Sequence, residues 1–272
     1  MRNMDVYQRL HNCIDNKIPA ALVTVTEVHG SSQSAIGVKL LCTPDDSWST
    51  AHSADDSLTE ILEDEARAMM AEKSSATRSR VWCPKDAETM VELELYTEVF
   101  LPPSRLIVAG AGHVAKPVVH LGKMIGMDVT VICDRENHAT KEQFPDADNV
   151  ICRDYIDYFK EVPVDQETYI LLLTRGHQYD VMILRELLGR DMGYVGMIGS
   201  KRRISGVFSQ LAVEFDEGAF QNIYAPVGLD IGAQTPEEIA VSVIAEVLKK
   251  KNGASGHSLS EEISYFILHK KE

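Results

Sequence analysis

The stretch "LIVAGAGHVAKPVVHLGKMIGMDVTVICDR", residues 106–135, decides the fold expected for this chain. It begins with a short apolar run, continues through a Gly-x-Gly-x-x-Ala spacing and a segment with helical periodicity, and closes with a second apolar run. A glycine-rich turn between a strand and a helix is typical of the first unit of a nucleotide-binding, doubly wound sheet. The sequence therefore predicts a Rossmann-like domain that starts here.

The residues of this turn have separate expected roles. Gly110 permits a tight turn with Ala111 beside it, and Gly112 lets backbone N–H groups approach a pyrophosphate. Ala115 allows the helix to pack closely on the strand, and the amino end of that helix attracts anions. His113 would lie at the start of the helix, near any bound phosphate. An exposed histidine without a role is the alternative.

A carboxylate at the end of the second strand indicates which nucleotide would bind. Asp134 follows the turn by roughly 20 residues, the position at which a carboxylate accepts both ribose hydroxyls of an adenosine and repels a 2′-phosphate. This spacing favours NAD over NADP. The neighbouring Arg135 is a reason for the opposite choice, because its guanidinium would accept the phosphate.

After residue 104, short apolar runs alternate with helical segments, which predicts an α/β fold with a doubly wound, mostly parallel sheet covered on both faces. The expected strands are residues 106–109, 129–133, 149–152, 169–174, 194–198 and 223–226. The expected helices are residues 114–125, 181–188, 201–215 and 236–250. The last of these carries a capping box from Thr235 to Glu238. Ligands of such a domain bind beyond the carboxyl ends of the strands.

A smaller α+β domain is expected before the double proline Pro102-Pro103, where two fixed φ angles end one element before the next begins. We expect helices at residues 4–16 and 58–72 and strands at residues 21–28, 38–42, 78–82 and 90–100. Ser57 is the expected cap of the second helix. The predicted domains are therefore residues 1–101 and 104–252. Residues 253–272 form a tail, in which a docking helix and a docking strand are both compatible with the sequence.

Composition excludes several classes of partner. With a net charge of −14, the chain is a poor ligand for nucleic acid or an anionic membrane. Charges interrupt the apolar positions at the amino terminus, and no run of about 18 apolar residues occurs, so neither a signal peptide nor a membrane span is predicted. The 5 cysteines are widely spaced without a Cys-x-x-Cys pair, which indicates reduced thiols in a cytoplasmic protein and no metal site.

Two basic loops follow later strands of the predicted sheet. In "TRGHQYD", Arg175, Gly176 and His177 precede Asp180; the sequence allows either a ligand-facing Arg/His pair or a helix entry capped by Asp180.

In "GMIGSKRRISG", Ser200 is the expected helix cap, and Lys201, Arg202 and Arg203 occupy the first turn. Cations at that end oppose the helix dipole, and a bound anion would resolve the conflict. Ordinary solvated side chains are the alternative.

A third loop, "APVGLDIGAQTPEE", places Gly228, Asp230 and Gly232 ahead of the last helix. Glycines at this spacing indicate unusual backbone angles or a close approach to a ligand. Asp230 would either accept hydrogen bonds from a heterocycle or fix its own loop.

The motifs "GAGHVA", "TRGHQYD", "GMIGSKRR" and "APVGLDIGAQTPEEIAVSVIAEVL" occur together in an order that resembles the xanthine dehydrogenase accessory factor family of the XdhC/CoxI type. The resemblance covers residues 106–248. It implies a cofactor-binding maturation factor, not an enzyme, that binds molybdenum cofactor, protects it during sulfuration and passes it to a molybdenum hydroxylase. A sulfurtransferase partner is implied as well, and a homodimer is expected from fold analogy.

The first domain resembles the family less closely. The family shows a Gly-Ser-Ser-Pro-Arg turn, a Gly-Thr-Ile-Gly-Gly-Gly loop and a Cys-Gly-Gly stretch, where this chain has "GSSQS", "SWSTAHSAD" and "ETMVELELY". Loss of the arginine removes an anion contact, and loss of the glycines closes backbone approach. The resemblance therefore carries no cofactor or sulfur role over to the first domain.

Two other functions remain open from the residues alone. An NAD(P)-dependent oxidoreductase would use His113 or His177 as acid or base. A regulatory module would sense a dinucleotide without chemistry and keep the same glycine turn.

Overall fold

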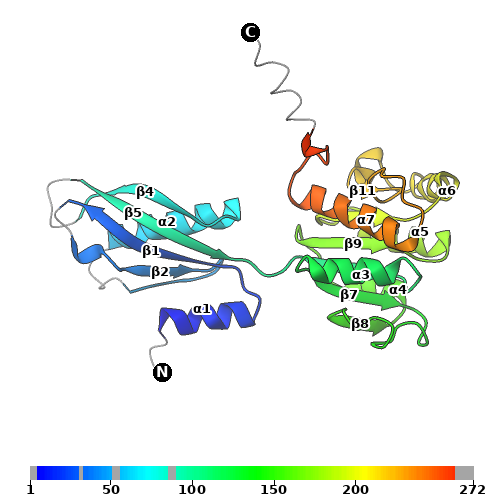
Figure 1. Ribbon diagram of the computed structural model, residues 1–272, viewed down its shortest axis with the longest axis horizontal. Coiled ribbons are helices and arrows are strands. Elements are labelled where there is room, and N and C mark those ends of the chain that lie inside the picture. The colour runs from blue at the N-terminus through cyan, green and yellow to red at the C-terminus, as the bar shows by residue number, and fades with distance from the viewer. Residues whose placement is uncertain (1–4, 31–32, 51–55, 85–89, 261–272) are drawn as a thin grey trace, which may run out of the picture. The chain divides into compact units, whose positions relative to one another are not determined.

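The computed structural model describes residues 5–30, 33–50, 56–84 and 90–260. The chain divides into two compact units, Met1–Pro103 and Ser104–Glu272, each with its own sheet and hydrophobic cores (Figure 1). Three stretches in which the first domain departs from the family resemblance lie partly outside the described residues, at residues 31–32, 51–55 and 88–89. So do residues 261–272 of the predicted tail.

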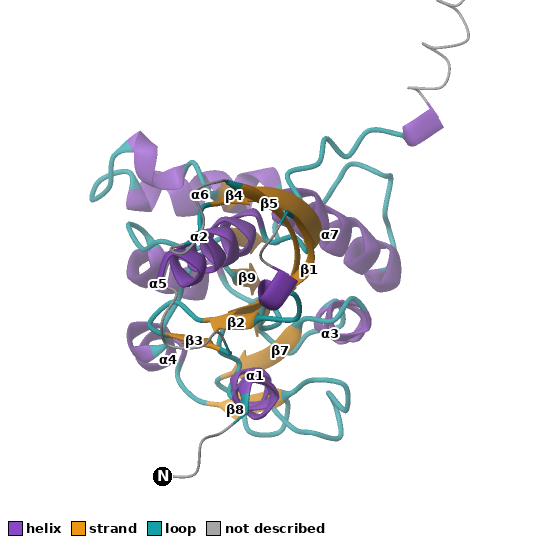
Figure 2. Ribbon diagram, turned by 90° about the vertical axis from the view of Figure 1, so that its left-hand side faces the viewer, coloured by secondary structure: helices purple, strands orange, loops and turns teal. Residues whose placement is uncertain are grey.

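The first unit is an antiparallel sheet of order β3-β2-β1-β5-β4 with a helix on each face. Its strands are β1 (Ala20–His29), β2 (Lys39–Cys42), β3 (Ser47–Ser49), β4 (Ala76–Trp82) and β5 (Val91–Phe100). Its helices are α1 (Val6–Asp15) and α2 (Asp56–Glu72). A register shift between Val25 and Glu27 interrupts the β1–β5 ladder, and Figure 2 shows both strands strongly curved. The predicted helices and strands of this region are thus present, with β3 in addition.

The cap predicted for α2 was wrong. The helix begins at Asp56, so Ser57 lies inside its first turn. Its hydroxyl instead accepts a hydrogen bond of 3.1 Å from Trp82 Nε1 on β4. The side chain therefore joins the helix to the sheet, because a buried indole N–H requires an acceptor.

The second unit is a parallel sheet of order β11-β10-β9-β6-β7-β8. Its strands are β6 (Arg105–Ala109), β7 (Asp128–Cys133), β8 (Asn149–Cys152), β9 (Thr168–Leu172), β10 (Tyr194–Met197) and β11 (Ile223–Tyr224). Numbered from β6, this order is the doubly wound 3-2-1-4-5-6 of Rossmann domains, which confirms the predicted fold. The strand order reverses between β6 and β9, so the ligand crevice is expected at their carboxyl ends.

Helices cover both faces of this sheet. They are α3 (Ala115–Met124), α4 (Tyr155–Glu161), α5 (His177–Leu187), α6 (Lys201–Leu211) and α7 (Pro236–Lys251). Figure 2 shows α3 and α7 on one side of the sheet and α4, α5 and α6 on the other. Each side has its own core, and α7 begins with the predicted capping box at Thr235 and Glu238. The short helix α4, capped by Asp154, was not predicted.

Several predicted ends of elements were displaced. Strand β9 ends at Leu172 instead of Thr174, although the N–H of Leu173 still donates to the carbonyl of Ala109 at 2.8 Å. Helix α6 ends at Leu211, before the predicted residue 215, and Glu214 beyond it pairs with Arg185 of α5.

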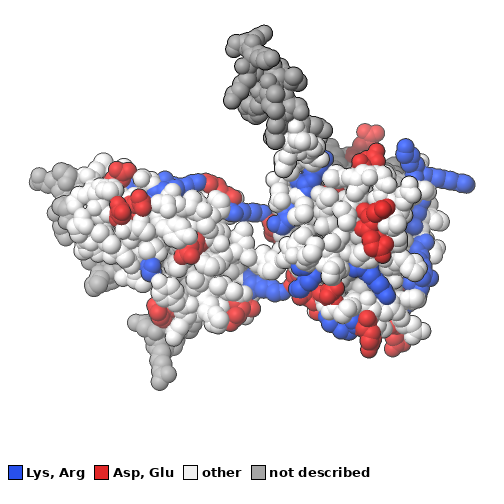
Figure 3. Space-filling view, in the orientation of Figure 1, with Lys and Arg blue, Asp and Glu red and all other residues white. Residues whose placement is uncertain are grey.

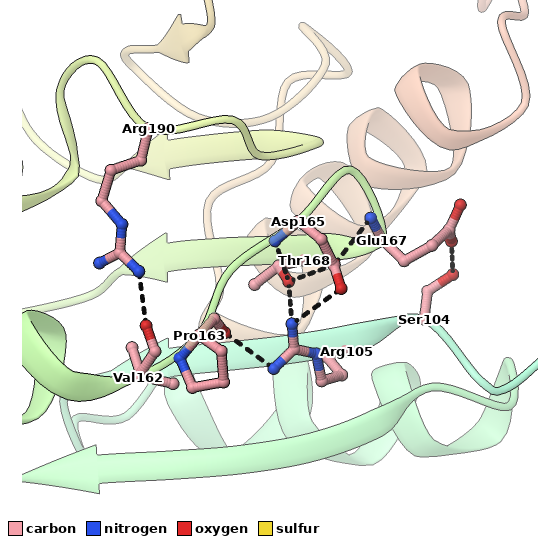
Figure 4. A network of polar contacts seen from close by, with 8 residues as sticks. All are labelled: Ser104, Arg105, Val162, Pro163, Asp165, Glu167, Thr168 and Arg190. Atoms are coloured by element: carbon pink, nitrogen blue, oxygen red, sulfur yellow. Dashed lines mark hydrogen bonds and ion pairs between the residues drawn. The ribbon is translucent and has the colours of Figure 1, made fainter. Parts of the chain in front are cut away.

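A polar network closes the amino ends of β6 and β9 (Figure 4). Arg105 donates to the carbonyl of Pro163 at 2.9 Å and to Thr168 Oγ1 at 2.7 Å, and it pairs with Asp165 at 3.2 Å. Ser104 donates to Glu167 Oε2 at 2.6 Å. Hydrogen bonds from Thr168 and Arg105 hold the pKa of Asp165 below its usual range, although burial acts to raise it. The network binds the start of the unit to the loop before β9.

Candidate functional site

The loops singled out in the sequence follow β6, β7, β9 and β10, and the parallel pairing of these strands brings the loops to one edge of the sheet. Lys and Arg side chains gather along the side of this unit where α5 and α6 lie (Figure 3). Cations concentrated at one edge are notable in a chain with a net charge of −14. The carboxyl-terminal edge is therefore the candidate site.

The glycine turn after β6 combines one packing role with one open position. Gly110 has a φ of +122°, and a Cβ there would lie 2.4 Å from the carbonyl oxygen of Leu173, so no other residue fits without a backbone shift. A Cβ on Gly112 would meet nothing within 4 Å. Ala115 is fully buried where α3 packs on the sheet. The turn is thus packed against Leu173 at Gly110, whereas the space beside Gly112 is open.

A first pocket of about 180 Å³ lies beside this turn. It contains the predicted residues Gly110, Ala111, Asp134 and Arg175. Its remaining lining residues are Arg135, Tyr155, Leu173 and Tyr179. The structure thus brings the glycine turn, the carboxylate after β7 and the arginine after β9 to one cavity.

Two tyrosines form a wall of this first pocket that the sequence did not predict. The rings of Tyr155 and Tyr179 meet edge to face with centroids 5.5 Å apart. Hydrogen bonding with the Asp134 carboxylate raises the pKa of Tyr179, whereas burial is the main cause that raises the pKa of Tyr155. Both tyrosines lie in the first turn of a helix at the carboxyl edge, so correct prediction of the starts of α4 and α5 would have indicated them.

A second pocket of about 420 Å³ lies between the start of α5 and the start of α6. It contains the predicted residues Arg175, Gly176, His177, Arg202 and Arg203, together with Ser200, Gly206 and Gln210. Arg175 lines both pockets and is the residue that the two share. A ligand extending from the glycine turn to α6 would pass Arg175.

The cap role considered for Asp180 was wrong, and so was the helix start at residue 181. Helix α5 begins at His177 with Gly176 as its N-cap, and Asp180 is fully buried in the first turn. Asp180 accepts hydrogen bonds from Thr174 Oγ1 at 2.6 Å and from Arg203 Nε at 2.9 Å. The carboxylate joins two loops that are distant in sequence, which local sequence cannot indicate.

Burial raises the pKa of Asp180, while hydrogen bonds from Thr174 and Arg203 oppose the shift. Arg203 also donates to the carbonyl of Thr174 at 3.2 Å. Its guanidinium is therefore occupied by the protein and holds the loop after β9 against α6. Among the three cations of the "SKRR" loop, Arg203 is a positioning residue.

The other cations of this edge are differently placed. Within the described ranges, the side chains of Arg175, Lys201 and Arg202 form no hydrogen bond or ion pair with another residue. Lys201 and Arg202 are exposed at the first turn of α6, where Ser200 Oγ caps the backbone N–H of Arg203 at 3.3 Å as predicted. Three cations near a positive helix end favour an anionic ligand there.

The loop before α7 lies outside both pockets. Gly228 has a φ of +108°, and its Cβ would lie 2.4 Å from Ser242 Oγ, so this glycine serves packing against α7. Its N–H donates to Glu246 Oε2 at 2.9 Å. Asp230 and Gly232 are exposed and line neither pocket.

His113 is likewise exposed and outside the two pockets.

The described residues form neither a metal-binding cluster nor a membrane-spanning helix. Within the described part of the chain, no three His, Cys, Asp or Glu side chains lie close enough together to hold a metal ion. No helix among those residues is both long and apolar enough to cross a membrane.

Comparisons with known proteins cover most of the chain. The family model of the XdhC Rossmann domain matches residues 106–247, and that of the XdhC and CoxI family matches residues 13–80. A protein of Bacillus subtilis (strain 168) that is named as a probable xanthine dehydrogenase component is 33% identical over 150 residues, 55% of this chain and 44% of that protein. The uncharacterized protein YqeB of Escherichia coli (strain K12) is 29% identical over 154 residues, 56% of this chain and 28% of that protein. The chain therefore spans less than half the length of either relative.

A solved structure shares the fold over nearly the whole chain. The crystal structure of a xanthine dehydrogenase from Bacillus halodurans superposes with a TM-score of 0.54 at 21% identity, covering 94% of this chain and 98% of that one. At this level of identity the likeness concerns the fold alone.

Proposed function

Because this chain belongs to the XdhC and CoxI family, we propose that it acts as a xanthine dehydrogenase accessory factor that binds molybdenum cofactor as its cargo. The client would be a molybdenum hydroxylase of the xanthine dehydrogenase type, in keeping with the name of the B. subtilis relative. Protection of the cofactor while a sulfurtransferase installs its terminal sulfur is part of the same proposal and rests on family membership.

The observation that carries this proposal is the set of cations without a protein partner at the ligand edge. Arg175, Lys201 and Arg202 form no ion pair among the described residues, although the chain has an excess of carboxylates. A pterin that carries a phosphate supplies the anion that these side chains and the start of α6 would bind.

The residues at this edge fit such a cargo. The open space above Gly112 lets backbone N–H groups reach a phosphate, as in other turns of this kind. Arg175 would contact the cargo from both pockets, and Arg202 would contact it from α6. Arg203 and Asp180 would hold these loops in place without contacting it.

The test is purification from a host able to make molybdenum cofactor. Acid and iodine oxidation releases a fluorescent pterin, and elemental analysis measures molybdenum in the same sample. We expect near-stoichiometric pterin on the wild type and a loss of at least about tenfold in Arg175→Glu and Arg202→Glu, because each reverses a charge that faces the anion.

Lys160→Glu is the matched control, since it makes the same charge change on an exposed position of α4 outside both pockets. Equal pterin content in all four proteins would contradict the site. Absence of pterin from the wild type would favour a dinucleotide as the ligand.

One specific observation supports the alternative function, in which the protein binds a dinucleotide. The turn at Gly110 and the carboxylate of Asp134 line the same pocket, as a site for NAD(P) would require. Titration with NADH or NADPH, followed by nicotinamide fluorescence, tests it. Binding with substrate turnover would support an oxidoreductase, binding without turnover or pterin would support a sensor, and no fluorescence change at millimolar concentration would exclude both.

A further inference from the structure

Two cysteines lie side by side where strands β7 and β8 end. The parallel pairing of these strands puts Cys133 directly opposite Cys152, and each is the last residue of its strand. Figure 1 shows β7 and β8 as neighbours in the second unit. The other cysteines of the chain, Cys13, Cys42 and Cys83, belong to the first unit. A pair of thiols therefore stands at the carboxyl edge of the second sheet.

Both cysteine side chains project to the same face of this sheet. Successive side chains of a strand alternate between the two faces, and opposite residues of paired strands share a face. Cys133 and Val150 pack in the core on the α3 and α7 side, whereas Ile151 packs in the core on the other side. Cys152 follows Val150 by two residues, so it projects to the face on which Cys133 lies.

The spacing of the two residues suits a disulfide that forms and breaks reversibly. Both thiols are free in the structure. Neighbouring strands lie roughly 4.8 Å apart, and the Cα atoms of a disulfide are usually about 4.4–6.8 Å apart. A bond between opposite residues of one sheet is thus near the short end of that range. Disulfides that depart from the preferred geometry are strained and easier to reduce, as regulatory disulfides are.

The two thiols differ in their access to solvent. Cys152 is exposed on the edge strand β8, whereas Cys133 is fully buried. Thiol–disulfide exchange requires an accessible thiolate, so a reagent from solution meets Cys152 first. Cys133 Sγ also donates to Asp134 Oδ1 at 3.8 Å, and Asp134 lines the first pocket. A chemical change at Cys133 therefore reaches the candidate site.

We propose that Cys133 and Cys152 are a modification site that reacts with a low-molecular-weight disulfide, such as oxidised glutathione, to form a reversible disulfide between β7 and β8. The Cys152 thiolate attacks one sulfur of the reagent, the S–S bond of the reagent breaks, and one small thiol leaves. The Cys133 sulfur then attacks the Cys152 sulfur of this mixed disulfide, and the second small thiol leaves. The two protein thiols lose two electrons and two protons, and the reagent is reduced to two thiols. The product lacks the S–H that Cys133 donates to Asp134, so oxidation changes the hydrogen bonding of the first pocket.

Peptide mapping of the full chain tests the proposal, and its result does not depend on the cargo. The protein is incubated with oxidised glutathione, the remaining thiols are blocked with N-ethylmaleimide in denaturant, and the tryptic peptides are analysed by mass spectrometry without reduction. Trypsin cleaves after Arg135 and Lys141, between the two cysteines, so a disulfide joins two separate peptides. We expect a linked pair that contains Cys133 and Cys152 and that dithiothreitol separates. Glutathione on Cys152 together with a free Cys133 thiol would overturn the proposal.

Three variants test the order of the two steps. Cys133→Ser leaves the exposed thiol without a second thiol beside it, so we expect glutathione to remain on Cys152. Cys152→Ser removes the exposed thiol, so the buried Cys133 should stay unmodified. Cys83→Ser is the matched control, because it removes an exposed thiol from the first unit, and the linked pair should form as in the wild type. Glutathione on Cys133 of Cys152→Ser, at the level found on Cys152 of Cys133→Ser, would contradict the proposed order.

Two further results would overturn the proposal. A link between Cys83 and Cys152 that forms as readily as the expected one would show that oxidation does not select the pair. A link found only in covalent dimers on a non-reducing gel would show that it joins two chains. The Cys133→Ser variant places a hydroxyl in the core and is the one at risk of not folding. The wild-type map and the exposed Cys152→Ser variant decide the question without it.

Discussion

The two edges of the second sheet differ in whether the protein itself supplies hydrogen-bond partners for their arginines. At the amino edge, other residues of the chain accept the hydrogen bonds of Arg105 and Arg190. Arg190 donates to the carbonyl of Val162 at 2.5 Å, as Figure 4 shows, and to that of Phe159 at 2.7 Å. At the carboxyl edge, Arg175 and Arg202 have no hydrogen-bond or ion-pair partner among the described residues. Cations satisfied by the protein stabilise the fold, whereas cations left open are available to a ligand. The comparison therefore predicts where a substitution costs stability and where it costs binding.

Arg203 is the exception at the carboxyl edge, and its partner gives the largest expected loss of stability. Asp180→Ala should lower the free energy of unfolding by about 3 kcal/mol, because it leaves a largely buried guanidinium without its carboxylate. Chemical denaturation measures the change. Asp230→Ala, an exposed carboxylate of the same edge, should change the free energy of unfolding by less than about 0.5 kcal/mol. Similar values for the two variants would show that the buried pair does not hold these loops.

The amino-edge network predicts a smaller loss. Arg105→Ala removes hydrogen bonds to Pro163 and Thr168, and we expect a decrease of about 1–2 kcal/mol in the free energy of unfolding. Arg175→Ala should cost less than about 0.5 kcal/mol, because its exposed side chain has no hydrogen bond or ion pair with a described residue to lose. The same denaturation series compares the pair. A larger loss for Arg175 than for Arg105 would reverse the proposed division between the two edges.

The fold was largely predictable because its signals are local. Short apolar runs and the Gly110 turn located the parallel strands, and β8 was predicted with its exact bounds. The errors came from contacts between distant segments. Asp180 looks like a helix cap in sequence, yet its partner Arg203 lies 23 residues away. The glycine at position 228 has one of the two features that its spacing predicted, an unusual backbone angle with a φ of +108°, and it packs on Ser242 of α7.

The candidate site was predictable only in part for the same reason. Parallel topology brings Gly110, Asp134 and Arg175 together once the strands are known. Whether a cation is available to a ligand depends on whether a carboxylate from another loop pairs with it. Arg203 has such a partner in Asp180, and the side chain of Arg202 has none among the described residues. Tyr155 and Tyr179 were not predicted as lining residues, because helix α4 was not predicted and the start of α5 was predicted four residues too late.

The stability contributed by Asp165 at the amino edge should depend on pH. The pKa of Asp165 is lowered in the folded protein, so its contribution is present above its unfolded pKa of about 4 and is lost as the pH falls through the folded value. The stability difference between wild type and Asp165→Asn should therefore be larger at pH 7 than at pH 3. We expect the difference to stay below about 1 kcal/mol, since the carboxylate is well exposed. Denaturation at both pH values measures it, and a difference that grows on acidification would contradict the sign.

The smallest effect on stability has the opposite sign and separates folding from function most clearly. Lys201 opposes the dipole at the start of α6, so Lys201→Glu should raise the free energy of unfolding by about 0.5 kcal/mol. Lys160 lies in the last turn of α4, where a cation is favourable, and Lys160→Glu should lower it slightly. In the proposed accessory factor, the stabilising variant should nevertheless lose copurified pterin, while the destabilising one should keep it. A position at which a more stable helix binds its ligand less well is one where the cation serves the ligand, and pterin retained by Lys201→Glu would assign Lys201 to the solvated surface instead.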